Sequence, residues 1–201
     1  MNRRLFIALE PPPAVRRRLA AIQAEMKRLA GRNADDVRWV GPDNLHVTLQ
    51  FLGAVPEERV EAVAAAVSAV AAAAAPLHLE LRGAGAFPHG RKPRVLWAGL
   101  SGDLERLSTL VADLGAALGP LGFPPEDRAF SPHVTLGRSR EPRGAPRLAA
   151  AIAGTANVSG PSWRVLEVEV VQSHLSPAGS RYETIARAPL GAPSPLPSER
   201  R

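Results

Sequence analysis

The tetrapeptide His-Val-Thr-Leu occurs twice in this chain, as HVTLQFLG at residues 46–53 and as HVTLGRSR at residues 133–140. Side chains of a β-strand point alternately to its two faces. The valine and leucine of each copy therefore share one face, which we expect to lie in the core, and the histidine and threonine share the other. We predict that each copy is a strand with a polar face. The residues that we place on these polar faces are His46, Thr48, Gln50, His133 and Thr135.

The rest of the chain alternates between short apolar runs and segments of helical periodicity. Apolar residues at a spacing of three and four predict amphipathic helices, and alternation predicts half-buried strands. We expect a glycine-rich loop at 83–93. The predicted helices are 14–30, 57–75, 104–118 and 147–154. The predicted strands are 4–9, 37–40, 45–52, 77–81, 94–100, the second HVTL segment, 162–175 and 182–190.

This order of elements favours an α+β fold with mainly antiparallel pairing. The order strand, helix, strand, strand occurs in the first half and, more loosely, in the second, with one HVTL copy in each half. The pattern suggests an internal duplication. We expect a single domain over residues 1–191, followed by a disordered proline-rich and serine-rich tail over residues 192–201.

Composition limits the chemistry that the chain can use. The 201 residues include no cysteine, which excludes disulfides, thiolate metal sites and a cysteine nucleophile. The net charge is +6, which suits either a solvated surface or a phosphate-bearing partner such as RNA. No signal segment or membrane span is evident, so we expect a cytoplasmic protein with no membrane contact. No exposed apolar helix face stands out, so we expect a monomer.

The repeated motif supplies groups for acid–base chemistry if the two halves pack around a pseudo-twofold axis. Two imidazoles with pKa values near 6.5 would then face one cleft, one to act as base and one as acid. The two threonine hydroxyls would bond the oxygens of a bound phosphate. These groups suit hydrolysis at an RNA 2′,3′-cyclic phosphate. Sequence reasoning leaves open which histidine is the acid.

Arg138 would neutralise charge that develops on phosphorus, but its spacing is unfavourable. It lies five residues after His133, so an unbroken strand would place it on the opposite face. Gly137 lies between them, and a bulge there would return the arginine to the polar face.

Two other interpretations of the motifs remain open. Each copy is also compatible with a polar strand face that has no function. A metal site would combine His46 and His133 with one of His78, His89 or His174. Hydrolytic metal sites usually include carboxylates or closely spaced histidines, and neither copy has an Asp or Glu beside its histidine. We therefore expect no metal and no other cofactor.

Longer segments around the motifs resemble a known family. WVGPDNLHVTLQFLG (39–53) and FSPHVTLGR (130–138) are similar to the two signatures of the bacterial and archaeal RNA 2′,3′-cyclic phosphodiesterases, also called 2′-5′ RNA ligases. These proteins belong to the two-histidine phosphoesterase superfamily. RLFIALEPP near the N-terminus, PRVLWAGL, and the late SHLSPAGSRYETIARAPL also resemble family segments in family order.

The resemblance implies a bilobal fold with two antiparallel sheets around a central cleft and helices outside. It implies metal-independent hydrolysis of a 2′,3′-cyclic phosphate to a 2′-phosphomonoester, with reverse 2′-5′ ligation that needs no ATP. By motif, His46 would be the proton donor to the leaving O3′ and His133 the proton acceptor from water. Thr48 and Thr135 would hold phosphate oxygens.

Other residues are weaker candidates for RNA contacts. Arg91 and Lys92 would bind the RNA backbone from the glycine-rich loop, and Tyr182 would stack on a base. The substrate is also open, because the same fold would suit small cyclic nucleotides or other RNA 3′ ends. A non-catalytic RNA-binding module with inert histidines is the third interpretation.

Overall fold

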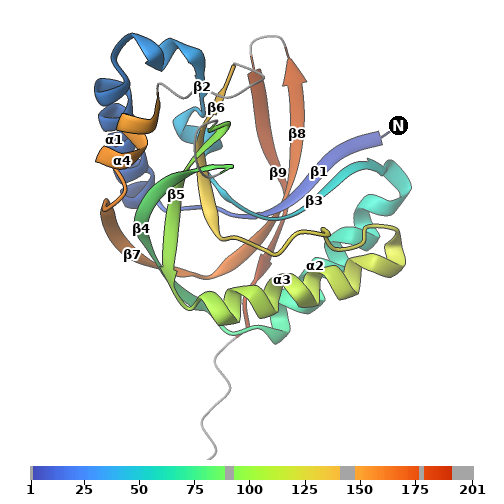
Figure 1. Ribbon diagram of the computed structural model, residues 1–201. Helices are drawn as coiled ribbons and strands as arrows, with labels where there is room; N and C mark the ends of the chain where they lie inside the picture. Colours follow the sequence, from blue (N-terminus) through green and yellow to red (C-terminus); the bar gives the residue numbers. More distant parts are fainter. Residues whose placement is uncertain (1, 89–92, 141–147, 177–178, 192–201) are drawn as a thin grey trace, which may run out of the picture.

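A computed structural model describes residues 2–88, 93–140, 148–176 and 179–191 (Figure 1). The predicted tail and the loop candidates Arg91 and Lys92 lie outside these residues. Within them the strands are β1 (Asn2–Leu9), β2 (Val37–Trp39), β3 (Val47–Pro56), β4 (Leu77–Phe87), β5 (Val95–Gly102), β6 (His133–Ser139), β7 (Ser159–Val165), β8 (Glu167–Ser176) and β9 (Gly179–Pro189). The α-helices are α1 (Pro13–Ala30), α2 (Val60–Ala73), α3 (Leu104–Leu118) and α4 (Ala149–Gly154).

The strands form one sheet in the order β7-β4-β5-β6-β3-β1-β8-β9, and β2 pairs with β6 beside this path. Every described pairing is antiparallel. These pairings confirm the predicted α+β class with mainly antiparallel strands. The two HVTL strands, β3 and β6, are neighbours at the centre of the sheet.

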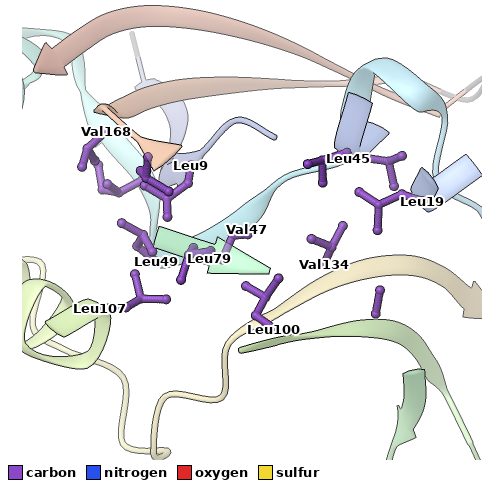
Figure 2. Packing of buried hydrophobic residues seen from close by; sticks show 14 of the residues in the cluster. Leu9, Leu19, Leu45, Val47, Leu49, Leu79, Leu100, Leu107, Val134 and Val168 are labelled. Carbon is purple, nitrogen blue, oxygen red and sulfur yellow. The ribbon is translucent and has the colours of Figure 1, made fainter. Parts of the chain in front are cut away.

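The expectation of two separate sheets is wrong. β3 and β6 are joined at one residue pair, Val47 opposite Val134, and this pair makes the strands one continuous sheet. Both valines are completely buried at the junction (Figure 2). Two buried apolar strands that meet edge to edge can also pair their backbone groups, which would otherwise be buried without partners.

The two sides of the junction are built alike. On one side β3 is followed by β1, β8 and β9, and on the other side β6 is followed by β5, β4 and β7. Along the chain, β1, α1 and β3 match β5, α3 and β6, because each set is a strand, a helix and an HVTL strand in that order. The described topology therefore agrees with the repeat seen in the sequence.

The helices cover the outside of the sheet in two pairs (Figure 1). α1 packs against α4 and β7, whereas α2 packs against α3 and β9. Four of the apolar positions whose spacing predicts an amphipathic helix are buried in α1, namely Val15, Leu19, Ile22 and Met26, and Leu29 is partly buried. α1 begins at Pro13, which needs no partner for its missing N–H, and it ends before Gly31, which has a positive φ of 55°. No helix in the described ranges is both long enough and apolar enough to cross a membrane.

Two predicted boundaries were wrong. The segment expected to be a loop from residue 83 is strand up to Phe87, because its small residues allow close packing. A side chain at Gly85 would come within 2.5 Å of the Trp97 ring on β5. The predicted strand 162–175 is two strands, β7 and β8, which lie in different parts of the sheet. Their alternating patterns follow one another almost without interruption, so periodicity alone could not separate them.

Candidate active site

A bulge in β3 decides which side chains follow Thr48 toward the polar face. Ala8 of β1 pairs with Thr48, and Ile7 pairs with Gln50, so Leu49 is an extra residue on β3. In such a bulge two successive residues oppose one residue of the partner strand. Leu49 and Gln50 are accordingly both buried, at 4% and 3% exposure.

The bulge makes the prediction for Gln50 wrong. Its side chain lies in the core, where its amide donates hydrogen bonds to the carbonyls of Phe123 and Pro124 at 3.0 and 3.2 Å. Phe51 takes its place beside His46 and Thr48, with 52% of its surface exposed. The phenyl ring lies 5.9 Å from that of Phe6, between ring centroids.

β6 carries a bulge at the equivalent position. Trp97 of β5 pairs with Thr135 and Leu96 pairs with Gly137, so Leu136 is the extra residue. The bulge brings Arg138 to the same side as Thr135, and both line one pocket. A local irregularity near Gly137 therefore does return the arginine to the polar face.

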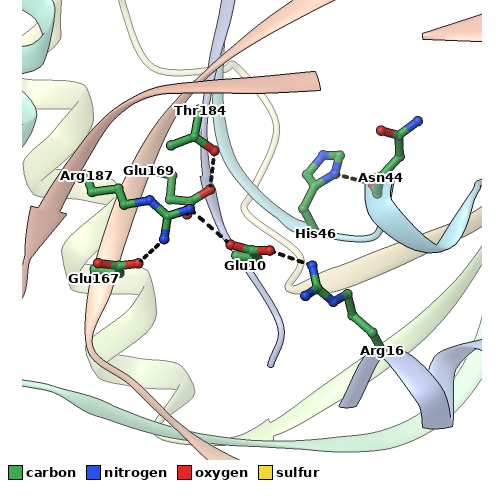
Figure 3. A network of polar contacts seen from close by, with 8 residues as sticks. All are labelled: Glu10, Arg16, Asn44, His46, Glu167, Glu169, Thr184 and Arg187. Carbon is green, nitrogen blue, oxygen red and sulfur yellow. Dashed lines mark hydrogen bonds and ion pairs between the residues drawn. The ribbon is translucent and has the colours of Figure 1, made fainter. Parts of the chain in front are cut away.

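The two histidines are held in the same way. The Nδ1–H group of His46 donates to the carbonyl of Asn44 at 2.7 Å (Figure 3), and that of His133 donates to the carbonyl of Ser131 at 2.7 Å. In both cases the acceptor lies two residues before the histidine. Because Nδ1 carries the proton in the neutral ring, Nε2 is left as the basic nitrogen. Nε2 of His46 lies 3.0 Å from the hydroxyl of Thr48.

Aromatic residues pack against both imidazoles. The His46 ring lies 4.8 Å from the ring of Phe6 and meets the ring of Tyr182 edge-on at 5.2 Å. The His133 ring meets the ring of Phe87 edge-on at 5.2 Å. These contacts restrict the orientation of each imidazole and remove water from around it.

Both histidines have a lowered pKa. Burial is the main cause for each, and the hydrogen bonds to the Asn44 and Ser131 carbonyls oppose it. The positive charge of Arg138 lowers the pKa of both rings further, and a charged His133 lowers the pKa of His46. Arg138 thus acts electrostatically on both imidazoles.

A pocket of about 320 Å³ lies beside His46 and Arg138. Its lining includes His46, Thr48, Thr135, Arg138 and Tyr182. His133 is not among the described lining residues; it lies two positions before Thr135 on β6. Two arginines and no carboxylate are found among the described residues that line it. Such a pocket attracts an anion.

Three further lining residues were not found from the sequence: Arg4, Phe51 and Leu175. Phe51 and Leu175 are two of the exposed large apolar residues, at 52% and 66%. Strict alternation after Thr48 would place Phe51 on the core face with Leu49, and only the bulge set by the register with β1 turns it to the pocket. Arg4 gave no motif signal, and only the pairing of β1 with β3 brings it to the pocket.

The remaining histidines of the described chain lie elsewhere. His78 is 3.9 Å from Asp103, and Nε2 of His174 is 2.9 Å from Glu183. His89, the other candidate third ligand, lies outside the described residues. Within the described ranges, no group of three or more His, Asp or Glu side chains is placed to hold a metal ion.

An ion network supports the strands behind His46 (Figure 3). The Arg187 guanidinium lies 3.1 Å from Glu169 and 2.7 Å from Glu167, and it reaches Glu10 at 3.5 Å. Thr184 donates to Glu169 at 3.0 Å. The network ties the end of β1 to β8 and β9.

The sheet and the pocket together define the class: an α+β protein with two central HVTL strands, whose His46, Thr48, Thr135 and Arg138 line an anion-attracting pocket. The family described as LigT like Phosphoesterase matches residues 9–97 and 100–182. This chain belongs to that family.

Individual relatives agree with this assignment. A protein of Methanothermobacter thermautotrophicus named RNA 2′,3′-cyclic phosphodiesterase is 37% identical over 183 residues, which cover 90% of this chain and 96% of that protein. The crystal structure of TT0787 of Thermus thermophilus has a TM-score of 0.78 at 31% identity and covers 94% of this chain and 98% of that one. E. coli LigT complexed with 3′-AMP has a TM-score of 0.70 at 26% identity, with 94% and 99% covered.

Proposed function

We propose that this protein is an RNA 2′,3′-cyclic phosphodiesterase that hydrolyses the cyclic phosphate to a 2′-phosphomonoester by two-histidine acid–base catalysis. The observation that carries the proposal is the equivalent anchoring of His46 and His133. Each Nδ1–H donates to a carbonyl two residues earlier, which leaves each Nε2 to exchange a proton. The relatives named for this activity, at about one-third identity over most of the chain, support it.

The reaction needs two proton transfers on opposite sides of phosphorus. Neutral His133 takes a proton from the attacking water through Nε2, and a new P–O bond forms. The bond between phosphorus and O3′ breaks, and the cation of His46 donates its Nε2 proton to the leaving O3′. The product is a 2′-phosphate beside a free 3′-hydroxyl. With the 5′-hydroxyl of a second RNA in place of water, the same displacement of O3′ would join the two RNAs through a 2′-5′ bond.

Hydroxyl and guanidinium groups stabilise the charge on phosphorus. Thr48 and Thr135 donate to non-bridging oxygens, and Arg138 balances the negative charge that increases in the transition state. Before substrate arrives, the Thr48 hydroxyl is 3.0 Å from His46 Nε2 and donates to it. Protonation of His46 releases this hydroxyl, because the cationic ring no longer accepts, and the hydroxyl turns to the phosphate.

The terminal nucleotide would rest against the apolar side of the pocket. Phe51 offers an exposed ring, and Leu175 lies in the same lining. A base stacked on such a ring gains about 1–3 kcal/mol. Tyr182 packs edge-on against His46 and Phe6, so it orients the histidine and completes the wall on which the base lies.

We further propose that residues 1–191 act as one bilobal domain around a pseudo-twofold axis at the junction of β3 and β6. The equivalent bulges and carbonyl anchors of the two HVTL strands support this. A monomeric state and a cytoplasmic location stay predictions.

The test is incubation of the protein, in EDTA, with an RNA that ends in a 2′,3′-cyclic phosphate and, separately, with a cyclic mononucleotide. We expect conversion of both to 2′-phosphate products, which chromatography separates from 3′-phosphates. Turnover that disappears in EDTA would contradict a mechanism that depends on histidines alone. Much faster turnover of the mononucleotide would favour a small cyclic nucleotide as the substrate, and binding of RNA without turnover would favour a non-catalytic module.

A further inference from the structure

A second hollow lies next to the active site, beside β2. It has a volume of about 440 Å³ and is formed by the C-terminal part of α1, the segment before β2, β2 itself and the end of β6. Three of the described residues that line it are cations: Lys27, Arg38 and Arg140. Among the same described residues, Asp35 is the one acidic side chain. We call this hollow the β2 groove.

A pair of opposed arginines lies between the β2 groove and the catalytic pocket. Arg38 of β2 lies directly opposite Arg138 of β6 in the antiparallel register. Directly opposed residues point to the same face, with their Cβ atoms about 5 Å apart. Arg138 lines the catalytic pocket and Arg38 lines the β2 groove, so the two guanidinium groups form a bridge of positive charge between them.

Lys27 is held in position before any ligand arrives. Its ammonium lies 5.2 Å from the centroid of the Trp39 ring. The ring is itself fixed, because the indole N–H of Trp39 donates to the carbonyl of Ala34 at 3.0 Å. A cation over an aromatic face has fewer conformations to lose when it binds an anion.

The carboxylates of the described residues do not neutralise these cations. Lys27, Arg38, Arg138 and Arg140 form no ion pair with a carboxylate of the described residues, and all four side chains are exposed. Some arginines on other surfaces, such as Arg3 and Arg28, are paired with glutamates, whereas others, such as Arg164, have no ion pair with a described residue. Three of these unpaired cations line the β2 groove, and the fourth, Arg138, lies opposite Arg38 and lines the catalytic pocket.

We propose that the β2 groove binds the phosphate backbone of single-stranded RNA upstream of the cyclic end, an inference that rests on the proposed function. With the terminal phosphate at Arg138, the preceding phosphates would pass Arg38 and then reach Lys27 and Arg140. The groove offers cations rather than base-reading groups, since the face of Trp39 is covered by Lys27. Binding there is therefore independent of sequence and sensitive to salt.

The test compares a substrate that reaches the groove with one that does not. The double variant Lys27→Gln/Arg38→Gln is assayed with a cyclic-phosphate RNA of about ten nucleotides and with the cyclic mononucleotide. We expect kcat/KM for the RNA to fall about 10-fold, and the ratio of RNA to mononucleotide turnover to fall by the same factor. An equal loss on both substrates would place the damage in the catalytic pocket and overturn the proposal.

A binding measurement tests the β2 groove separately from the phosphodiesterase activity. Fluorescence anisotropy with a labelled single-stranded RNA that ends in a 3′-hydroxyl requires no turnover. Loss of two phosphate contacts should reduce the slope of log Kd against log salt by about 1.4, at about 0.7 for each contact on a single strand. An unchanged slope would refute the groove even in an active enzyme. A wild type without activity but with the expected slope change would refute the phosphodiesterase proposal alone.

Arg164→Gln is the matched control. Arg164 is an exposed arginine of β7, pairs across the sheet with His78, and is separated from β6 by β4 and β5. The substitution removes one positive charge from the chain without touching the groove. If Arg164→Gln changed RNA binding as much as Arg38→Gln alone, the effect would be one of net charge, and the proposal would fail.

Discussion

Phe51 and Arg138 occupy equivalent positions in the two halves of the protein. Each lies five residues after its motif histidine. Each is turned toward the pocket by a bulge at the leucine that follows the motif threonine. One half therefore contributes an exposed aromatic ring and the other a guanidinium group to the same pocket. A nucleotide has one group suited to each, the base to the ring and the phosphate to the cation.

Loss of either motif histidine should remove most of the activity. We expect His46→Ala and His133→Ala each to lower kcat/KM by at least about 10²-fold, because each would remove one of the two proton transfers. His78→Ala, an exposed histidine of β4, serves as the control. A rate within about threefold of wild type in either motif variant would remove that histidine from the mechanism.

The pH profile of kcat/KM should have its maximum on the acidic side of the usual histidine range. Catalysis needs one histidine neutral and one protonated in the free enzyme, which gives a bell. Burial and Arg138 lower the pKa of both His46 and His133, so both limbs move below the ordinary value of about 6.5. Initial rates at low substrate concentration from about pH 4 to 9 would show this, and a flat profile would contradict the pair.

Phe51 should matter for substrate binding more than for the chemical step. Phe51→Ala removes a stacking surface of about 1–3 kcal/mol, which predicts a KM for the cyclic mononucleotide that is higher by about 10-fold with little change in kcat. The side chain is half exposed, so a large loss of stability is not expected. Leu166→Ala is a control, because this exposed apolar residue lies away from the pocket. A fall in kcat alone would contradict the assigned contact.

Gln23 positions the bulge that carries Arg138. Its buried amide donates to the carbonyls of Val40 and Leu136, both at 2.8 Å. Gln23→Leu would leave buried carbonyls with fewer partners and should lower the free energy of unfolding by about 1–3 kcal/mol. Because the Leu136 bulge would then shift, kcat/KM should also fall for the RNA and for the cyclic mononucleotide. The slope of log Kd against log salt for RNA binding should stay unchanged. Urea titrations would measure the free energy of unfolding and initial rates would measure kcat/KM, with Gln172→Leu as the control variant.

Glu169 should make stability decrease as the pH rises. The residue is 4% exposed, and burial, together with the nearby negative charge of Glu10, raises its pKa despite the bond from Thr184 and the charge of Arg187. A raised pKa means that the native state binds more protons than the unfolded state above about pH 4.3. The stabilising contribution of this carboxyl to the free energy of unfolding is therefore complete below about pH 4.3 and is lost as the pH rises to the native pKa. The free energy of unfolding, measured by urea titration from about pH 4 to 8, should fall more steeply with rising pH for wild type than for Glu169→Gln. Parallel pH dependences for the two proteins would contradict the raised pKa.

Several features of the fold and the site could be predicted from the sequence alone. The valines of the HVTL copies are buried, and the histidines and threonines lie at the polar side, as their alternation indicates. The helix that begins near Pro13 and ends at Gly31 also has the predicted burial. These are local properties, because strand alternation and helical periodicity depend on residues within a few positions of each other.

The tertiary structure decided the rest. Whether Gln50 or Phe51 reaches the pocket depends on a bulge, and that bulge exists only in the register with β1, a strand about forty residues earlier. The junction of Val47 with Val134, which makes one sheet out of two halves, also joins distant segments. Pairing across a sheet depends on packing and backbone hydrogen bonds between residues far apart in the chain, and a one-residue change in register reverses the side chains that follow.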